Sequence, residues 1–209
     1  MTAVAIFDRD ATIIDVVRDE ESGSMSVAFH PSQLRLLDGA VEGMRALQDA
    51  GFRVAIATNQ PAPAKGQFSA QAVRRTNDAL VELLARSGVA ISAIEVCMHH
   101  PEGGHGGDAT LVRSCECRKP KAGMLDAIVE RLGAERSRSW MIGDSPSDMA
   151  AGRAAALRTA LVFLPNRCEL CPLRGGPASA AVASGAVPNI YGSTLAEIAK
   201  AILACPEAV

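Results

Sequence analysis

Four short polar stretches of this 209-residue sequence each follow directly on an apolar run. They are Asp-Arg-Asp at 8–10, Thr-Asn-Gln at 58–60, Cys-Met-His at 97–99 and Gly-Asp-Ser-Pro-Ser-Asp at 143–148. Together they would deliver carboxylates, hydroxyls and a thiolate–imidazole pair. Such a set suits hydrolytic or metal chemistry if the fold brings the four stretches to one place.

The aspartates suit phosphoryl transfer. Asp8 and Asp10, with Asp144, would make a hard oxygen site of the kind that binds Mg²⁺ next to a phosphate. The cation is needed because a carboxylate cannot easily approach a phosphate dianion while the charge is uncompensated. Asp8 could then attack phosphorus and form an aspartyl-phosphate, while Asp10 protonates the leaving oxygen and later activates water. Thr58 and a lysine would hold the phosphoryl oxygens.

Residues 97–120 contain a second candidate site, with three of the six cysteines and three of the four histidines of the chain. A Cys-x-His at 97–99 precedes a glycine-rich run, a Cys-x-Cys at 115–117 follows it, and Arg118-Lys119 comes directly after. Where cysteines stay reduced, clustered cysteines and histidines indicate metal binding or catalysis before a disulfide.

These stretches need a scaffold that alternates strands with helices. Continuous apolar runs predict strands at 3–7, 52–58, 93–99, 139–144 and 158–165. Amphipathic periodicity predicts helices at 40–50, 69–86, 122–132, 147–157 and about 194–204, the last opening with a Thr194-x-x-Glu197 capping box. The alternation indicates an α/β fold with a parallel sheet covered on both faces. In such folds ligands bind beyond the carboxyl ends of the strands, where all four polar stretches lie.

The composition narrows the class of protein. A mass of 21.8 kDa with 48% hydrophobic residues suits one core, and therefore a single domain over residues 1–209. The net charge of −2 argues against a nucleic-acid-binding surface. No apolar run is long enough to span a membrane and the amino terminus lacks a basic signal region, so we expect a cytoplasmic protein.

Residues 165–189 are rich in Pro, Gly and Ser and predict a long flexible loop. Cys168 and Cys171 lie within it. They lack two nearby partners for a metal and a following helix for a thioredoxin-like site, so we expect reduced thiols.

Three of these polar stretches, together with the Arg-Lys-Pro that ends the cysteine-containing segment, resemble the motifs of a known family. Asp-Arg-Asp-Ala-Thr at 8–12, Ala-Thr-Asn-Gln at 57–60, Arg-Lys-Pro at 118–120 and Gly-Asp-Ser-Pro-Ser-Asp at 143–148 are similar, in order and spacing, to the four motifs of the haloacid-dehalogenase superfamily of phosphatases. The resemblance covers about residues 3–165. It implies a Rossmann-like, doubly wound parallel sheet with a zinc-bound loop insertion and no large cap, and a Mg²⁺-dependent phosphoric monoester hydrolase.

The cysteine-containing segment resembles the zinc loop of the D-glycero-D-manno-heptose 1,7-bisphosphate phosphatases, which the phosphatase domain of histidinol-phosphate enzymes shares. The resemblance implies one structural zinc within residues 97–117, held by Cys97, His99, Cys115 and Cys117. The glycine-rich run is too flexible to hold a shape alone, so zinc would fix its ends and place the two cations that follow. His100 and His105 are alternatives to His99, and free thiols are an alternative to zinc.

The same resemblance assigns roles to the remaining residues. Catalysis falls to Asp8, Asp10, Thr58 and Lys119, Mg²⁺ binding to Asp8, Asp10 and Asp144, and substrate binding to Asn59, Gln60, Arg118 and Ser145. Asp148 either caps the helix that it opens or orients Lys119 or a metal-bound water. The chain departs from the family at Ala11, where glycine is usual, and in residues 14–38 and 61–66, beside the non-reacting end of a substrate.

The expected activity is removal of the 7-phosphate from a heptose 1,7-bisphosphate, in carbohydrate metabolism, by a monomer. Three alternatives stay open. They are a histidinol-phosphate phosphatase, a nucleic-acid 3′-phosphatase, which the net acidity disfavours, and a metal-stabilised binding protein without activity, which the intact motifs oppose.

Overall fold

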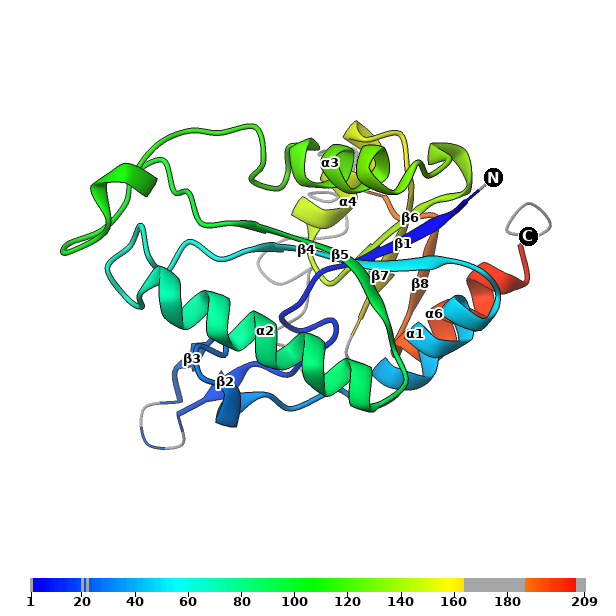
Figure 1. Ribbon diagram of the computed structural model, residues 1–209, viewed down its shortest axis with the longest axis horizontal. Coiled ribbons are helices and arrows are strands. Elements are labelled where there is room, and N and C mark those ends of the chain that lie inside the picture. The colour runs from blue at the N-terminus through cyan, green and yellow to red at the C-terminus, as the bar shows by residue number, and fades with distance from the viewer. Residues whose placement is uncertain (1, 20, 22, 164–186, 206–209) are drawn as a thin grey trace.

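The computed structural model describes residues 2–19, 21, 23–163 and 187–205, and its centre is a six-stranded parallel sheet (Figure 1). The strand order is β5-β4-β1-β6-β7-β8. The strands are β1 (Val4–Phe7), β4 (Arg53–Asn59), β5 (Ile91–Cys97), β6 (Trp140–Gly143), β7 (Arg158–Val162) and β8 (Ile190–Gly192). The chain winds outward from β1 to one edge and then from β6 to the other, which confirms the doubly wound sheet. The carboxyl ends of β1, β4 and β6 therefore meet at the point where such folds bind ligands.

Helices cover both faces of the sheet (Figure 1). α3 (Gly123–Leu132) and α4 (Pro146–Ala154) lie on one face, and α1 (Ala40–Asp49), α2 (Ala70–Arg86) and α6 (Leu195–Leu203) on the other. Within β1, Val4 and Ile6 point to the first face, while Ala5 and Phe7 point to the second. Both sets are buried, which explains why the strand is a continuous apolar run.

The observed helices follow the predicted ones closely, except that α4 ends at Ala154 and not at 157. Only half of the predicted capping box forms at α6. Thr194 Oγ1 accepts from the backbone N of Glu197 at 3.1 Å, but the Glu197 carboxylate turns to the backbone N of Ser193 at 2.8 Å. None of the helices in the described ranges is long and apolar enough to cross a membrane.

The segment between β1 and α1 holds a small hairpin that the sequence pattern did not predict. It consists of β2 (Val17–Arg18) and β3 (Met25–Ser26), followed by the 3₁₀ turn η1 (Pro31–Gln33). In the part of this segment that the structure describes, no larger cap is inserted. The predicted flexible loop at 165–189 lies outside the described residues apart from 187–189, as do Cys168 and Cys171.

The glycine-rich part of the cysteine loop (residues 97–117) is held by more than its ends, contrary to our expectation. It packs directly on the β4 loop (residues 60–69). A Cβ added at Gly104 would collide with the backbone of Lys65, and one at Gly66 would collide with the backbone of His105. The two backbones thus touch at positions that admit only glycine. The cysteine loop therefore contacts the β4 loop through its glycine-rich part as well as being joined to the fold at its ends.

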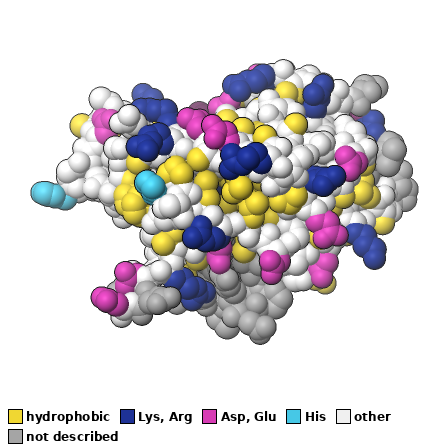
Figure 2. Space-filling view, turned by 60° about the horizontal axis from the view of Figure 1, so that its bottom comes forward, with side chains coloured by type: hydrophobic (Ala, Val, Ile, Leu, Met, Phe, Trp, Pro, Cys, Tyr) yellow, Lys and Arg dark blue, Asp and Glu magenta, His cyan; other side chains and the backbone are white. Residues whose placement is uncertain are grey.

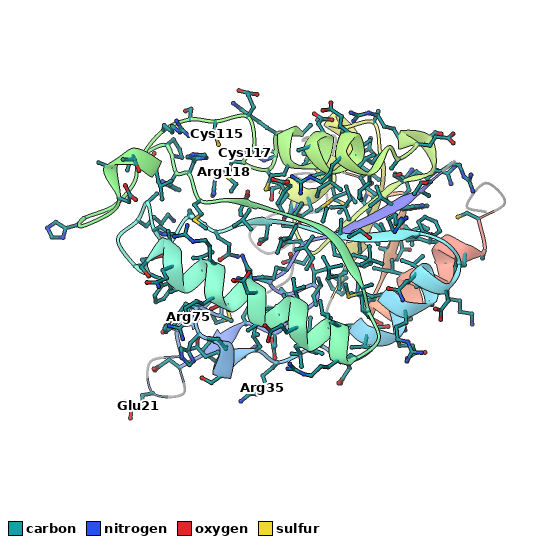
Figure 3. The ribbon with its side chains drawn as sticks, in the orientation of Figure 1. Glu21, Arg35, Arg75, Cys115, Cys117 and Arg118 are labelled. Carbon is teal, nitrogen blue, oxygen red and sulfur yellow. The ribbon has the colours of Figure 1, made fainter. Side chains whose placement is uncertain are left out.

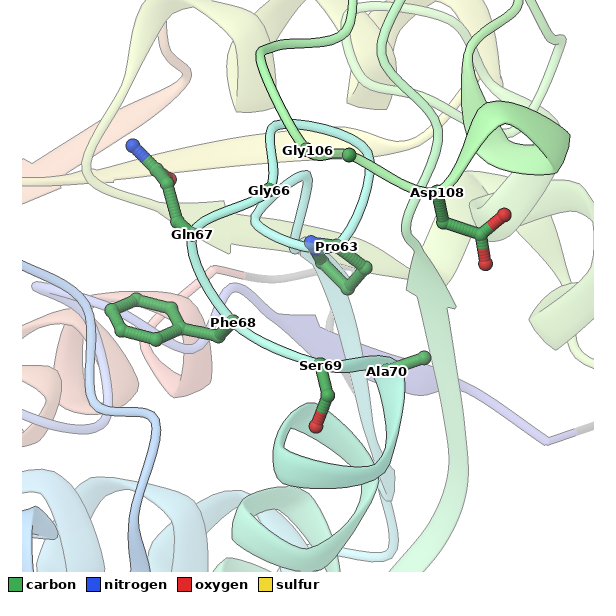
Figure 4. Close-up of a pocket in the computed structure, with 9 residues that line it drawn as sticks. Pro63, Gly66, Gln67, Phe68, Ser69, Ala70, Gly106 and Asp108 are labelled. Atoms are coloured by element: carbon green, nitrogen blue, oxygen red, sulfur yellow. The ribbon is translucent and has the colours of Figure 1, made fainter.

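A shallow groove of about 440 Å³ lies beside this contact (Figure 4). It runs between the start of α2 and the tip of the cysteine loop, with Pro63, Phe68 and Asp108 among its lining residues. The backbone N of Asp108 donates to the carbonyl oxygen of Pro63 at 3.0 Å and closes one end of the contact between the loops.

Candidate active site

Lys119 lies buried at the centre of the site. Its Nζ is 2.8 Å from Asp8 Oδ1, 2.6 Å from Asp148 Oδ1 and 2.8 Å from the carbonyl oxygen of Ala57. Burial acts to lower the pKa of Lys119, but the carboxylates of Asp148 and Asp8 outweigh it and raise that pKa above its ordinary value. Lys119 is therefore a fixed positive charge beside the predicted nucleophile.

Three carboxylates converge next to this lysine. Ligand oxygens of Asp8, Asp144 and Asp148 lie within 4.8 Å of one another. Burial, with the negative charges of Asp8 and Asp148, raises the pKa of Asp144 well above its ordinary value. Three carboxylates against one ammonium group leave an excess of two negative charges, which one divalent cation would balance. The donor set fits Mg²⁺, which favours carboxylate oxygens.

The carboxylate of Asp10, predicted as a Mg²⁺ ligand with Asp8 and Asp144, lies outside this group, whose third member is Asp148. The Asp10 carboxylate faces two donors: Arg9 Nη2 is 2.9 Å from Oδ1, and Gln60 Nε2 is 2.6 Å from Oδ2. Burial raises the pKa of Asp10 in spite of the adjacent guanidinium, which favours the protonated form that a general acid needs.

The Thr-Asn-Gln stretch at the end of β4 forms hydrogen bonds with other residues of the site, Lys119 and Asp10. Asn59 Oδ1 accepts from the backbone N of Lys119 at 3.1 Å, and Asn59 Nδ2 donates to the backbone oxygen of Lys119 at 3.0 Å. Gln60 Nε2, besides holding Asp10, donates to Thr58 Oγ1 at 3.0 Å. Asn59 and Gln60 are predicted to bind substrate, but their amides are engaged by protein groups. In this arrangement they position Lys119 and Asp10.

Ser145 and Asp148 cap α4 reciprocally. Ser145 Oγ accepts from the backbone N of Asp148 at 3.3 Å, and Asp148 Oδ2 accepts from the backbone N of Ser145 at 3.1 Å. Ser145, predicted to contact substrate, is therefore engaged in the cap. Both roles considered for Asp148 occur together, because its Oδ1 pairs with Lys119 while its Oδ2 serves the cap.

The four predicted zinc ligands come together in one cluster. Cys117 Sγ is 3.4 Å from Cys97 Sγ, 3.3 Å from Cys115 Sγ and 3.3 Å from His99 Nδ1. Ligands about 2.0–2.3 Å from a tetrahedral zinc ion stand at comparable separations. Burial and the adjacent sulfur atoms raise the pKa of Cys117, since thiolates this close repel one another. A bound cation would remove that repulsion, so the donor set fits zinc.

His100 and His105, the alternative ligands, are not part of the cluster. His100 Nδ1 instead accepts from the backbone N of Gly103 at 3.1 Å, and so supports the turn at the start of the glycine-rich run.

Arg118 lies close to Cys115 and Cys117 of the cysteine cluster (Figure 3). It stands between Cys117 and Lys119 in the sequence, and its Nη1 is 3.4 Å from the carbonyl oxygen of His99. Its side chain is partly exposed, unlike that of Lys119. This exposure leaves part of the guanidinium accessible to solvent.

The sequence pattern did not assign a role to Arg9, which lies in the site. Arg9 has no exposed surface, and it contacts Asp10, Asn77 and the carbonyl oxygen of Ala28. The signal was present, because a cation between two aspartates after a buried strand is placed to pair with one of them.

Known proteins resemble this chain in sequence and in fold. The HAD-hydrolase-like family model matches residues 116–163. The D-glycero-beta-D-manno-heptose-1,7-bisphosphate 7-phosphatase of Pasteurella multocida is 32% identical over 130 residues, which cover 62% of this chain and 68% of that protein. The protein of the same name from Pseudomonas aeruginosa is 36% identical over 126 residues, which cover 60% of this chain and 65% of that protein. The alignments thus span about two thirds of these relatives.

The fold is also similar to a solved structure over almost its whole length. The D,D-heptose 1,7-bisphosphate phosphatase from B. bronchiseptica, crystallised in complex with magnesium and phosphate, gives a TM-score of 0.70 at 26% sequence identity. The match covers 97% of this chain and 98% of that one.

Proposed function

The chain belongs to the haloacid-dehalogenase-like hydrolases, and we propose that it is a Mg²⁺-dependent phosphatase that forms an aspartyl-phosphate on Asp8. The observation that carries the proposal is the placement of the Lys119 ammonium between Asp8 and Asp148, with Asp144 completing the carboxylate group. A buried site with this excess of negative charge is suited to a cation and a phosphate, and to few other ligands.

The residues present support both halves of the reaction. A carboxylate oxygen of Asp8 attacks phosphorus, the phosphorus–oxygen bond to the sugar breaks, and the proton of Asp10 passes to the leaving oxygen. Asp10, now a carboxylate, takes a proton from water as the water oxygen attacks phosphorus. The bond between Asp8 and phosphorus then breaks, and phosphate leaves.

Two further residues contact the phosphoryl group in this proposal. Lys119 keeps its proton and offsets the charge of the phosphoryl oxygens. Thr58 Oγ1 accepts from Gln60, so its own proton is available for a phosphoryl oxygen. Mg²⁺, held by Asp8 and Asp144, would reduce the repulsion between nucleophile and phosphate. Asp148 is less suited as a ligand because Lys119 and Ser145 already engage its oxygens.

The proposed substrate is a heptose 1,7-bisphosphate, from which the 7-phosphate is removed. This rests on the names of the curated relatives and on the match to the B. bronchiseptica structure. The partly exposed guanidinium of Arg118 beside Lys119 suits a substrate with a second phosphate.

We also propose one structural zinc ion per chain at Cys97, His99, Cys115 and Cys117. Four protein donors fill a tetrahedral site and leave no position for water or substrate. We further propose that the protein is a monomer and lies in the cytoplasm, where these thiols stay reduced.

The rival functions differ in substrate. Histidinol phosphate lacks a second phosphate for Arg118. A nucleic-acid substrate calls for a basic stripe, whereas acidic and basic side chains are interspersed on the face in Figure 2.

The test is phosphate release, with Mg²⁺ and with excess EDTA, from heptose 1,7-bisphosphate, histidinol phosphate and a DNA 3′-phosphate. We expect Mg²⁺-dependent turnover that is fastest with the bisphosphate. Asp49→Asn, an exposed acid at the end of α1, is the matched control for Asp8→Asn. Release from none of the three substrates would refute the proposed function, and a preference for histidinol phosphate would refute the substrate assignment.

A further inference from the structure

Arg9 is the largest charged side chain with no exposed surface in the described part of the chain. A guanidinium removed from water is costly unless its donors are paired. In this case they are. Nη2 donates to Asp10 Oδ1 at 2.9 Å, and Nε lies 3.3 and 3.2 Å from the two oxygens of the same carboxylate.

The rest of the guanidinium is fixed by two elements distant in sequence. Nη1 donates to Asn77 Oδ1 on α2 at 2.7 Å, and Nη2 donates to the carbonyl oxygen of Ala28 at 3.1 Å. Ala28 follows the β2–β3 hairpin, and its neighbour Phe29 stacks on Phe68 of the β4 loop with ring centroids 3.9 Å apart. Arg9 is thus held by parts of the fold that take no part in the proposed reaction.

Asp10 receives hydrogen bonds from two partners, Arg9 at both carboxylate oxygens and Gln60 at Oδ2. A carboxyl group between two fixed donors has little rotational freedom. The planar fork of an arginine fixes orientation in a way that the point charge of a lysine does not.

Resting on the proposed function, we infer that Arg9 is a positioning residue that holds the Asp10 carboxyl group in line with the leaving oxygen of the substrate. It does not touch the phosphoryl group, which lies on the side of Asp8 and Lys119. Its contribution belongs to the proton transfer from Asp10 to the leaving group, and not to the attack by Asp8.

This assignment separates two kinds of ester. A sugar phosphate releases an alkoxide, which must be protonated as it leaves, whereas p-nitrophenyl phosphate releases a phenolate that leaves without a proton. General acid catalysis contributes roughly 10²- to 10⁴-fold where it is needed. Arg9→Lys keeps the buried charge but loses the fork, so kcat on heptose 1,7-bisphosphate should fall by about 10- to 100-fold. On p-nitrophenyl phosphate kcat should fall less than about threefold, and KM should change little for either ester.

The control is Asn77→Ala, which removes a partner of Arg9 on α2 and leaves all its contacts with Asp10. It should lower the melting temperature and change the ratio of the two rates far less than Arg9→Lys does. Arg9→Gln is a second variant, and Arg9→Lys carries the test if Arg9→Gln does not fold. Equal losses on the two esters, or no loss on either, would overturn the inference. A wild-type protein that hydrolyses p-nitrophenyl phosphate but not the sugar phosphate would overturn the substrate assignment and the inference with it. Inactivity on both esters would overturn the proposed function as well.

Discussion

Removal of Cys115, a proposed zinc ligand, should separate two contributions of the cysteine loop to catalysis. Lys119 has supports outside that loop: Asn59 clamps its backbone through bonds of 3.0 and 3.1 Å, and Asp8 and Asp148 pair with its ammonium group. Its Nζ should therefore stay near the reacting centre when zinc is lost. For Cys115→Ser we expect kcat to fall by less than about tenfold, below the hundredfold typical of a 1 Å misplacement.

Arg118 has weaker support and should respond more strongly. Its guanidinium donates to the carbonyl oxygen of His99 at 3.4 Å, and His99 is itself a proposed zinc ligand. A charge-assisted hydrogen bond contributes about 1.5–3 kcal/mol. If Arg118 moves and loses such a bond to the second phosphate of the substrate, binding weakens roughly 10- to 150-fold, at about 1.4 kcal/mol per factor of ten. The KM for heptose 1,7-bisphosphate should rise within that range, while the KM for p-nitrophenyl phosphate, with its single phosphate, should change little.

The assay is elemental analysis of the purified variant, followed by steady-state kinetics at saturating Mg²⁺. Cys205→Ser is the control, since Cys205 is a thiol outside the cluster whose Sγ donates to the carbonyl oxygen of Ala201. A hundredfold loss of kcat at unchanged KM would refute the independent support of Lys119. Unchanged kcat and KM in verified zinc-free protein would show that the metal serves stability alone.

Three further substitutions test the site and its frame. Asp8→Asn should lower kcat by far more than tenfold, which corresponds to about 1.4 kcal/mol, at an unchanged melting temperature, and a variant that keeps a tenth of the wild-type kcat would contradict the covalent mechanism. Asn59→Ala removes both bonds to the backbone of Lys119, so kcat should fall roughly 10- to 100-fold with little change in KM, and an effect confined to KM would return Asn59 to substrate binding. Ala11 has φ 56°, a left-handed value that costs a non-glycine residue roughly 1–2 kcal/mol. Ala11→Gly should therefore raise the free energy of unfolding by about 0.5–1 kcal/mol, after the greater chain entropy of glycine is counted, and urea denaturation showing a decrease would mean that the turn needs the methyl group.

Much of the fold was predictable because its strands are buried on both faces. Val4 to Phe7 form a continuous apolar run, and so do the strands on either side of β1, so the order of elements follows from the sequence. β8 and the β2–β3 hairpin have only two or three residues per strand, too few for a recognisable pattern. Their pairing depends on the neighbouring elements, which a local pattern does not contain.

In the site, the residue types were predictable but the direction of each side chain was not. The sequence places Asp8 and Asp10 two positions apart, yet one faces Lys119 and the other faces Arg9 and Gln60. Asn59 is a polar residue after a strand, as predicted. The oxygen and the nitrogen of its side-chain amide both form hydrogen bonds with the backbone of Lys119, which is 60 positions away. These bonds depend on how the β4 loop meets the segment before α3.

The contact between the β4 loop and the cysteine loop limits how these segments can be exchanged among relatives. Because backbone meets backbone at Gly66 and Gly104, neither loop has a side-chain layer that could adapt to a new partner. A chimera that takes only one loop from a relative would bring a Cβ against the other loop wherever the donor lacks the matching glycine. The two loops therefore form one transferable unit, and substrate preference in such chimeras should follow the pair.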